Sequence, residues 1–273
     1  MNGSMITAMA SMNGLQQKLD MLADNIANVN TVGYKKKVGT FEDLLTTLKE
    51  QPEAFNQPGR LTPMGFNQGW GSRLTMVQPD LSQGPLQQTD QPFDVAIEGN
   101  ALFQVQVDDA GHLGYTRGGS FQTSFTNNGI NILTTKEGYP VSSTSGQPIE
   151  IPPEMKAVSI DASGNVIGTS PAGQIVQLGQ LQLVQVDKPA LLNQVSDNLF
   201  AIADGVATAS VLHDVTASPE SKIAVKQGYL EQSNVVLADE MTDLISVQRA
   251  YQLSARALTS SDTMMGLANN LRA

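Results

Sequence analysis

The sequence predicts an α+β protein in which helices at the two ends pair as a coiled coil and the middle forms an antiparallel all-β domain. All 13 prolines lie between Pro52 and Pro219, and 21 of the 24 glycines lie between Gly33 and Gly228. Because proline and glycine interrupt helices, their distribution indicates helical ends and a middle built from strands and turns. The first end also carries a regular apolar pattern.

Residues 1–33 are predicted to form one long helix with a narrow apolar stripe. The stripe advances by alternating steps of four and three residues over four heptads, which is typical of a helix that packs along another helix. Gly33 follows the last member and is suited to end the helix. The stripe consists of Met1, Met5, Ala8, Met12, Leu15, Leu19, Leu22, Ile26 and Val29.

Residues 228–273 are predicted to form the second helix, with Ser233 or Asn234 as its cap. From Leu253 onward a neighbouring stripe takes over. Amphipathic helices usually pack on a globular core, but these narrow stripes favour pairing of the two ends instead. The main stripe comprises Leu237, Met241, Leu244, Gln248, Tyr251, Ala255, Leu258 and Met265, with Asp262 interrupting it, and the neighbouring one Ala257, Met264, Ala268 and Leu271.

The remaining residues divide into a connector and a β domain. Residues 34–84 are predicted to be an extended connector, because the span 51–80 is rich in Gly, Pro, Gln and Asn. Residues 85–227 are predicted to form the antiparallel domain, because apolar and polar residues alternate in strand-like runs. Hairpin-turn sequences stand between such runs at Asn127-Asn128-Gly129 and at 161–165.

Composition excludes several classes of function. The chain has no cysteine, two histidines and a formal charge of −10, which argue against thiol chemistry, cysteine-bound metals and nucleic acid as a main partner. No motif of nucleophilic, phosphate-binding or metal-dependent catalysis is present, so we expect no enzyme, cofactor, metal site or small-molecule substrate. No apolar run suits membrane insertion or a secretory signal peptide. The only basic run, Lys35-Lys36-Lys37, is expected to be a solvated loop or to touch a polar partner surface.

Five segments, in order along the chain, resemble the family of bacterial flagellar rod and hook proteins. The first resembles the amino-terminal motif of that family, and the last is followed by two further matches, Glu240-Met241 and Gln248–Tyr251. One departure is Ala101-Leu102, where the family usually has glycine and an aromatic residue. The segments are Leu22–Lys35, Gln83–Gly99, Tyr115–Phe121, Gly138–Val141 and Gln227–Val235.

The resemblance is strongest to the distal rod protein, with the proximal rod protein second. It implies a structural subunit of the flagellar basal-body rod, whose terminal helices self-assemble into a helical tube that transmits torque. It also implies a homo-oligomer, contact with other rod and hook proteins, and passage through the flagellar type III export apparatus without a cleaved signal. The alternative is a secreted β-rich binding module or adhesin that its terminal helices oligomerise.

The resemblance carries subunit assembly over to residues of both helices. Asn25 and Asn28 either end the stripe or make hydrogen bonds between subunits. The expected assembly residues are Leu15, Leu19, Leu22, Asn25, Ile26, Asn28 and Val29 on the first helix and Met241, Leu244, Tyr251 and Leu258 on the second.

Overall fold

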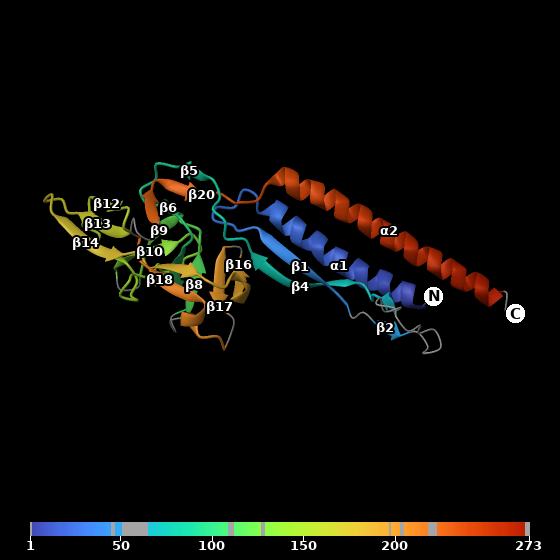
Figure 1. Ribbon diagram of the computed structural model, residues 1–273. Coiled ribbons are helices and arrows are strands. Elements are labelled where there is room, and N and C mark those ends of the chain that lie inside the picture. The colour runs from blue at the N-terminus through green and yellow to red at the C-terminus, as the bar shows by residue number, and fades with distance from the viewer. Residues whose placement is uncertain are drawn as a thin grey trace, which may run out of the picture. The chain divides into compact units, whose positions relative to one another are not determined.

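A computed structural model describes residues 2–44, 47–50, 65–108, 112–126, 129–196, 198–202, 205–217 and 223–270. The chain divides into two compact units (Figure 1). The helical unit comprises Met1–Ile26, Val38–Val77 and Leu237–Ala273, and the β unit comprises Ala27–Lys37 and Gln78–Val236. The predictions for Met1, for residues 51–64 of the connector, for the Asn127-Asn128 turn and for Leu271 fall outside the described residues.

Two long helices form at the ends of the chain, as predicted: α1 (Asn2–Ala27) and α2 (Leu237–Asn270). Neither contains proline, and within the helical unit they run in opposite directions (Figure 1). Helix α2 begins at Leu237, so the prediction that Ser233 or Asn234 caps it is wrong. The Asn234 side chain instead accepts a hydrogen bond from the Lys36 backbone N–H.

Two short β ribbons, most of whose residues belong to the helical unit, lie within the predicted connector. Strand β1 (Lys37–Asp43) pairs with β4 (Ser72–Pro79), and β2 (Thr47–Glu50) pairs with β3 (Gly65–Gln68). Helix α1 meets β4 closely at Gly14, where an added Cβ would stand 3.0 Å from the Ser72 carbonyl oxygen. A small residue in α1 therefore lets the ribbon backbone approach the helix.

All described strand pairs with a recorded register in the β unit are antiparallel, which confirms the predicted class. The largest sheet has the spatial order β16 (Leu192–Ser196), β17 (Leu199–Ile202), β8 (Leu113–Thr116), β7 (Leu102–Gln106), β15 (Leu183–Val186) and β18 (Leu212–Val215). Two three-stranded sheets contain β11 (Glu150–Ile151), β10 (Asn131–Thr135) and β9 (Phe121–Phe125), and β12 (Ala157–Ile160), β13 (Asn165–Thr169) and β14 (Ile175–Gln180). Two-stranded pairs join β19 (Ala224–Gln227) to β6 (Val95–Glu98) and β20 (Tyr229–Glu231) to β5 (Leu86–Gln88).

The predicted turn at residues 161–165 joins β12 to β13. The Gly164 N–H donates to the Asp161 carbonyl over 2.8 Å, and Gly164 has a φ of +77°. Glycine suits this position because a positive φ strains other L-residues. The structure therefore confirms this hairpin.

The hydrophobic core belongs almost entirely to the β unit. Among the described residues, 30 of the 32 buried hydrophobic side chains lie there, and Leu22 and Val247 are the two in the helical unit. Phe103 and Phe121 pack edge to face within the larger of its two buried clusters, with ring centroids 5.1 Å apart. The β unit can thus be stable by itself, whereas the helical unit has little core of its own.

Candidate functional site

The predicted apolar stripe of α1 lies on a covered side of the helix. Leu22 is only 3% exposed, and Leu15, Leu19 and Ile26 are half-buried. Asn28 and Val29 lie beyond the end of α1 and belong to the β unit, so the helical stripe ends earlier than predicted.

The covered side of α2 follows the same alternation of steps but differs from the predicted stripe. Met241 is 44% exposed and Gln248 is exposed, whereas Glu240 and Val247 occupy the corresponding covered positions. Because the covered side of α2 includes polar residues, a search for apolar residues alone predicts only part of it. The buried or half-buried series is Glu240, Leu244, Val247, Tyr251, Ser254, Leu258, Ser261 and Met265.

A buried polar contact joins the two helices. The Asn25 side-chain amide donates to a Glu240 carboxylate oxygen over 3.1 Å, and both residues are fully buried. The contact links the last turns of α1 to the first turn of α2 within one chain. A polar contact in a helix interface favours one register, because other alignments leave the polar groups unpaired. The role of Asn25 and the other named residues in subunit assembly stays a prediction.

Asn25→Ala is expected to destabilise the helical unit by about 1–3 kcal/mol, because it leaves the buried Glu240 carboxylate without one of its donors. Unfolding of the full-length monomer, followed by the fluorescence of Trp70 in the same unit, measures this change. Asn13→Ala is the matched control, because Asn13 lies on the exposed side of the same helix. Equal unfolding midpoints for the two variants would contradict the assigned role.

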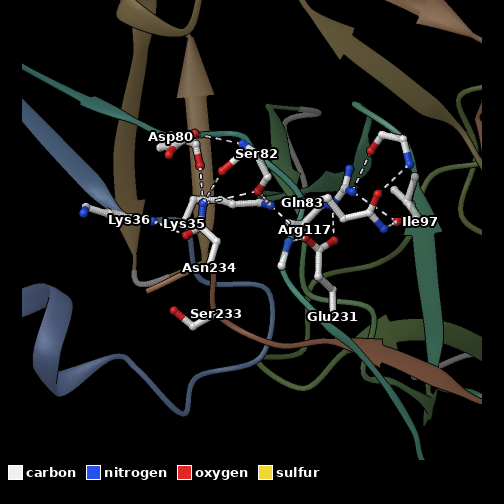
Figure 2. Close-up of polar contacts among 12 residues, drawn as sticks. Lys35, Lys36, Asp80, Ser82, Gln83, Ile97, Arg117, Glu231, Ser233 and Asn234 are labelled. Carbon is white, nitrogen blue, oxygen red and sulfur yellow. Dashed lines mark hydrogen bonds and ion pairs between the residues drawn. The ribbon is translucent and has the colours of Figure 1, made fainter. Parts of the chain in front are cut away.

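The β unit contains a buried ion cluster built from residues that are far apart in the sequence (Figure 2). The Lys35 ammonium donates to Glu231 over 2.8 Å, and the Arg117 guanidinium donates to the other Glu231 oxygen. All three side chains are 1% exposed. A backbone donor, the Gly84 N–H, also bonds Glu231 over 2.7 Å. The carboxylate is therefore satisfied by charge and by hydrogen bonds.

Backbone carbonyl oxygens also accept hydrogen bonds from both buried cations, Arg117 and Lys35. Arg117 donates to the carbonyl oxygens of Ile97, Gly99 and Ala101. Ala101 stands where the flagellar rod and hook proteins usually have glycine. Lys35 donates to the Ser82 carbonyl over 2.6 Å. Burial lowers the pKa of Lys35, and the neighbouring Glu231 opposes that shift.

Two glycines permit the close backbone packing around this cluster. Gly33 has a φ of +71°, and an added Cβ would stand 2.5 Å from the Gly118 nitrogen. A Cβ added to Gly84 would stand 2.1 Å from the Gln232 carbonyl oxygen. Any larger residue at either position would displace backbone that holds the cluster.

Lys35 shows where the sequence prediction was wrong. The basic run was expected to be solvated or to touch a partner, yet Lys35 is buried inside its own chain. The cluster joins residues from the family-like segments at 22–35, 83–99, 115–121 and 227–235. The sequence did show a charged residue in three of these segments, namely Lys35, Arg117 and Glu231. Their spacing along the chain does not indicate that they form ion pairs with one another.

Among the described residues, no group of three or more His, Asp or Glu side chains could hold a metal ion. No described helix is both long and apolar enough to cross a membrane.

Family models match three parts of the chain. Residues 5–35 match the flagella basal body rod protein model, and residues 96–168 match the D1 domain of the flagellar hook protein FlgE/F/G. Residues 226–271 match the C-terminal model of the flagellar basal body rod FlgEFG protein. The matches include most of both helices and part of the β unit.

Whole-chain relatives agree with these matches. The flagellar hook-basal body complex protein FlhP of Bacillus subtilis is 35% identical, over 98% of this chain and 99% of its own length. The flagellar basal-body rod protein FlgG is 33% identical in Borreliella burgdorferi, over 97% of each chain, and 35% identical in Agrobacterium fabrum, over 95% of each. These relatives are structural flagellar proteins and not enzymes. The chain therefore belongs to the flagellar basal-body rod protein family.

Proposed function

We propose that this chain is a structural subunit of the flagellar basal-body rod that polymerises through its terminal helices. The observation that carries the proposal is the exposed apolar surface of the helical unit. Of the 19 exposed large hydrophobic side chains among the described residues, 12 belong to this unit, which buries only two. Such surface is costly in a lone chain and is expected where further copies cover it.

Within each chain, we propose that α1 and α2 pair as an antiparallel coiled coil. Followed backward along α1 and forward along α2, the covered residues of the two helices occur at the same alternating steps of four and three residues. This alignment places Leu22 opposite Leu244, Leu19 opposite Val247 and Leu15 opposite Tyr251. The buried contact of Asn25 with Glu240 supports this register.

Between chains, we propose that the remaining helix surface makes the subunit contacts. Met241 is 44% exposed, so one copy does not cover it. The β unit then serves as a separate folded body of each subunit, and its buried ion cluster supports rigidity under torque. We further propose that the flagellar type III apparatus exports the chain, which assembles with other rod and hook proteins.

The location of the protein tests this function. Basal bodies that have been stripped of hooks are expected to contain the chain, and deletion of its gene is expected to abolish motility. The adhesin alternative predicts the opposite pattern. A chain spread over the cell envelope, with motility intact after deletion, would contradict the rod function.

A further inference from the structure

The exposed side of α1 carries an ordered series that changes from apolar to acidic. Its members occur at steps of three and four residues, so they share one side of the helix. We call this series the α1 outer stripe: Ile6, Met9, Asn13, Gln17 and Asp20, all of them exposed.

Nothing within α1 explains the acidic end of this stripe. Asp20 lies about two turns before the end of α1 at Ala27. Its neighbours one turn away are Gln16 and Asp24, which supply no cation. Within the described part of the chain, Asp20 has no ion-pair partner.

The side of α2 opposite its covered series carries a matching pattern. Arg249 and Arg256 lack an acidic residue three or four positions away, and neither forms an ion pair with a described residue. Leu253 stands between them, and Met264 and Leu267 follow, exposed by 64%, 52% and 63%. We call the exposed residues Leu253, Arg256, Ser260, Met264 and Leu267 the α2 outer stripe.

The two outer stripes are complementary when the helices run antiparallel. Their steps of 3, 4, 4 and 3 residues then coincide, with Ile6 opposite Leu267 and Met9 opposite Met264. Polar residues also coincide, because Asn13 meets Ser260 and Gln17 meets Arg256. At the far end Asp20 meets Leu253, which places its carboxylate between the two flanking arginines, Arg249 and Arg256.

We propose that the α1 outer stripe of one copy packs on the α2 outer stripe of a second copy, with Asp20 between Arg249 and Arg256. This inference rests on the proposed function and names the surface through which it works. A single chain cannot make the contact, because its own α1 and α2 already meet through their other sides. Charge complementarity and matched spacing make a second copy the fitting occupant.

The contact explains growth into an open assembly. Each copy contributes a different stripe to each of two contacts, so the interface is heterologous and continues from copy to copy. The alignment of α1 with α2 between copies differs by seven residues from their alignment within one chain. At 1.5 Å per residue this difference places neighbouring copies about 10 Å apart along the helix direction.

Charge exchange tests the proposal in cells that make this protein. The first variant, Asp20→Lys, places cations on both stripes, and the second, Arg249→Asp with Arg256→Asp, places anions on both. Each variant alone is expected to abolish motility and to reduce the chain in isolated basal bodies at least tenfold. In cells that co-express both variants, opposite charges meet wherever the two variants alternate, so alternating assembly is favoured and motility and basal-body content are expected to recover. The triple variant is expected to recover as well.

Matched controls lie on the exposed surface of the β unit. Glu154→Lys changes the charge as Asp20→Lys does, and Lys136→Asp with Lys156→Asp matches the double arginine variant. Both controls should swim normally. Normal assembly of either charge variant alone, or failure of both the mixture and the triple variant, would overturn this contact while leaving rod assembly itself intact. Absence of the unmodified chain from basal bodies would instead contradict the proposed function, and this contact with it.

Discussion

Leu22→Asp is expected to prevent assembly of the chain into rods while the β unit stays folded. Leu22 is one of two buried hydrophobic side chains described in the helical unit, so an aspartate there loses apolar burial and places a charge in the helix interface. We expect a cost of about 3–5 kcal/mol to the helical unit. Helical circular dichroism of the monomer and the amount of chain in basal bodies measure the two effects.

The control for this prediction is Leu22→Met, which conserves volume and apolarity and should cost less than about 1.5 kcal/mol. The thermal unfolding midpoint of the β unit should be the same in both variants, because its core lies in other residues. Normal rods built from the Leu22→Asp chain would show that the assigned helix interface is wrong.

Glu231→Gln is expected to produce the largest loss of stability in the β unit. Glutamine keeps the shape of the side chain but leaves Lys35 and Arg117 buried without a counter-charge. Breaking a buried ion pair in this way typically costs about 3–5 kcal/mol. Thermal or denaturant unfolding of the full chain measures the loss.

Two comparisons make this prediction specific. Lys35→Met keeps the ion pair of Arg117 with Glu231 and should cost less than Glu231→Gln. Glu98→Gln removes an exposed pair with Lys226 and should change the midpoint little. If all three variants unfolded alike, the ion cluster would have no special role.

The pH dependence of Glu231→Gln follows from the same cluster. Burial lowers the pKa of Lys35, and loss of Glu231 removes the main influence that raises it. The unfolded chain then holds the Lys35 proton more tightly than the folded chain, so the stability of the variant rises with pH toward the ordinary lysine pKa. The stability difference from the unmodified chain should therefore shrink between about pH 7 and about pH 10.

The helical ends could be predicted because their signal is local. The stripe through Leu15, Leu19 and Leu22 and the absence of proline set α1 without reference to the rest of the chain. The covered side of α2 was harder to predict. Its interface includes Glu240 and Ser254, which an apolar pattern does not count and which only the opposite helix explains.

The ion cluster could not be predicted because its members are distant in sequence. Lys35 lies 196 positions from Glu231, and no periodicity relates them. Their pairing depends on β20 and its neighbouring segments coming together in the folded β unit. The short strands within the predicted connector were missed for a similar reason, since β1 and β4 are separated by residues rich in glycine and proline.

An image reconstruction of isolated basal bodies, with this chain traced in it, tests the central claim most directly. We predict that α1 and α2 of every copy pair with each other and are enclosed by the helices of neighbouring copies, with Asp20 of one copy beside Arg249 and Arg256 of another. Helices that stand exposed to solvent, in an assembly held together by the β units alone, would contradict polymerisation through the terminal helices.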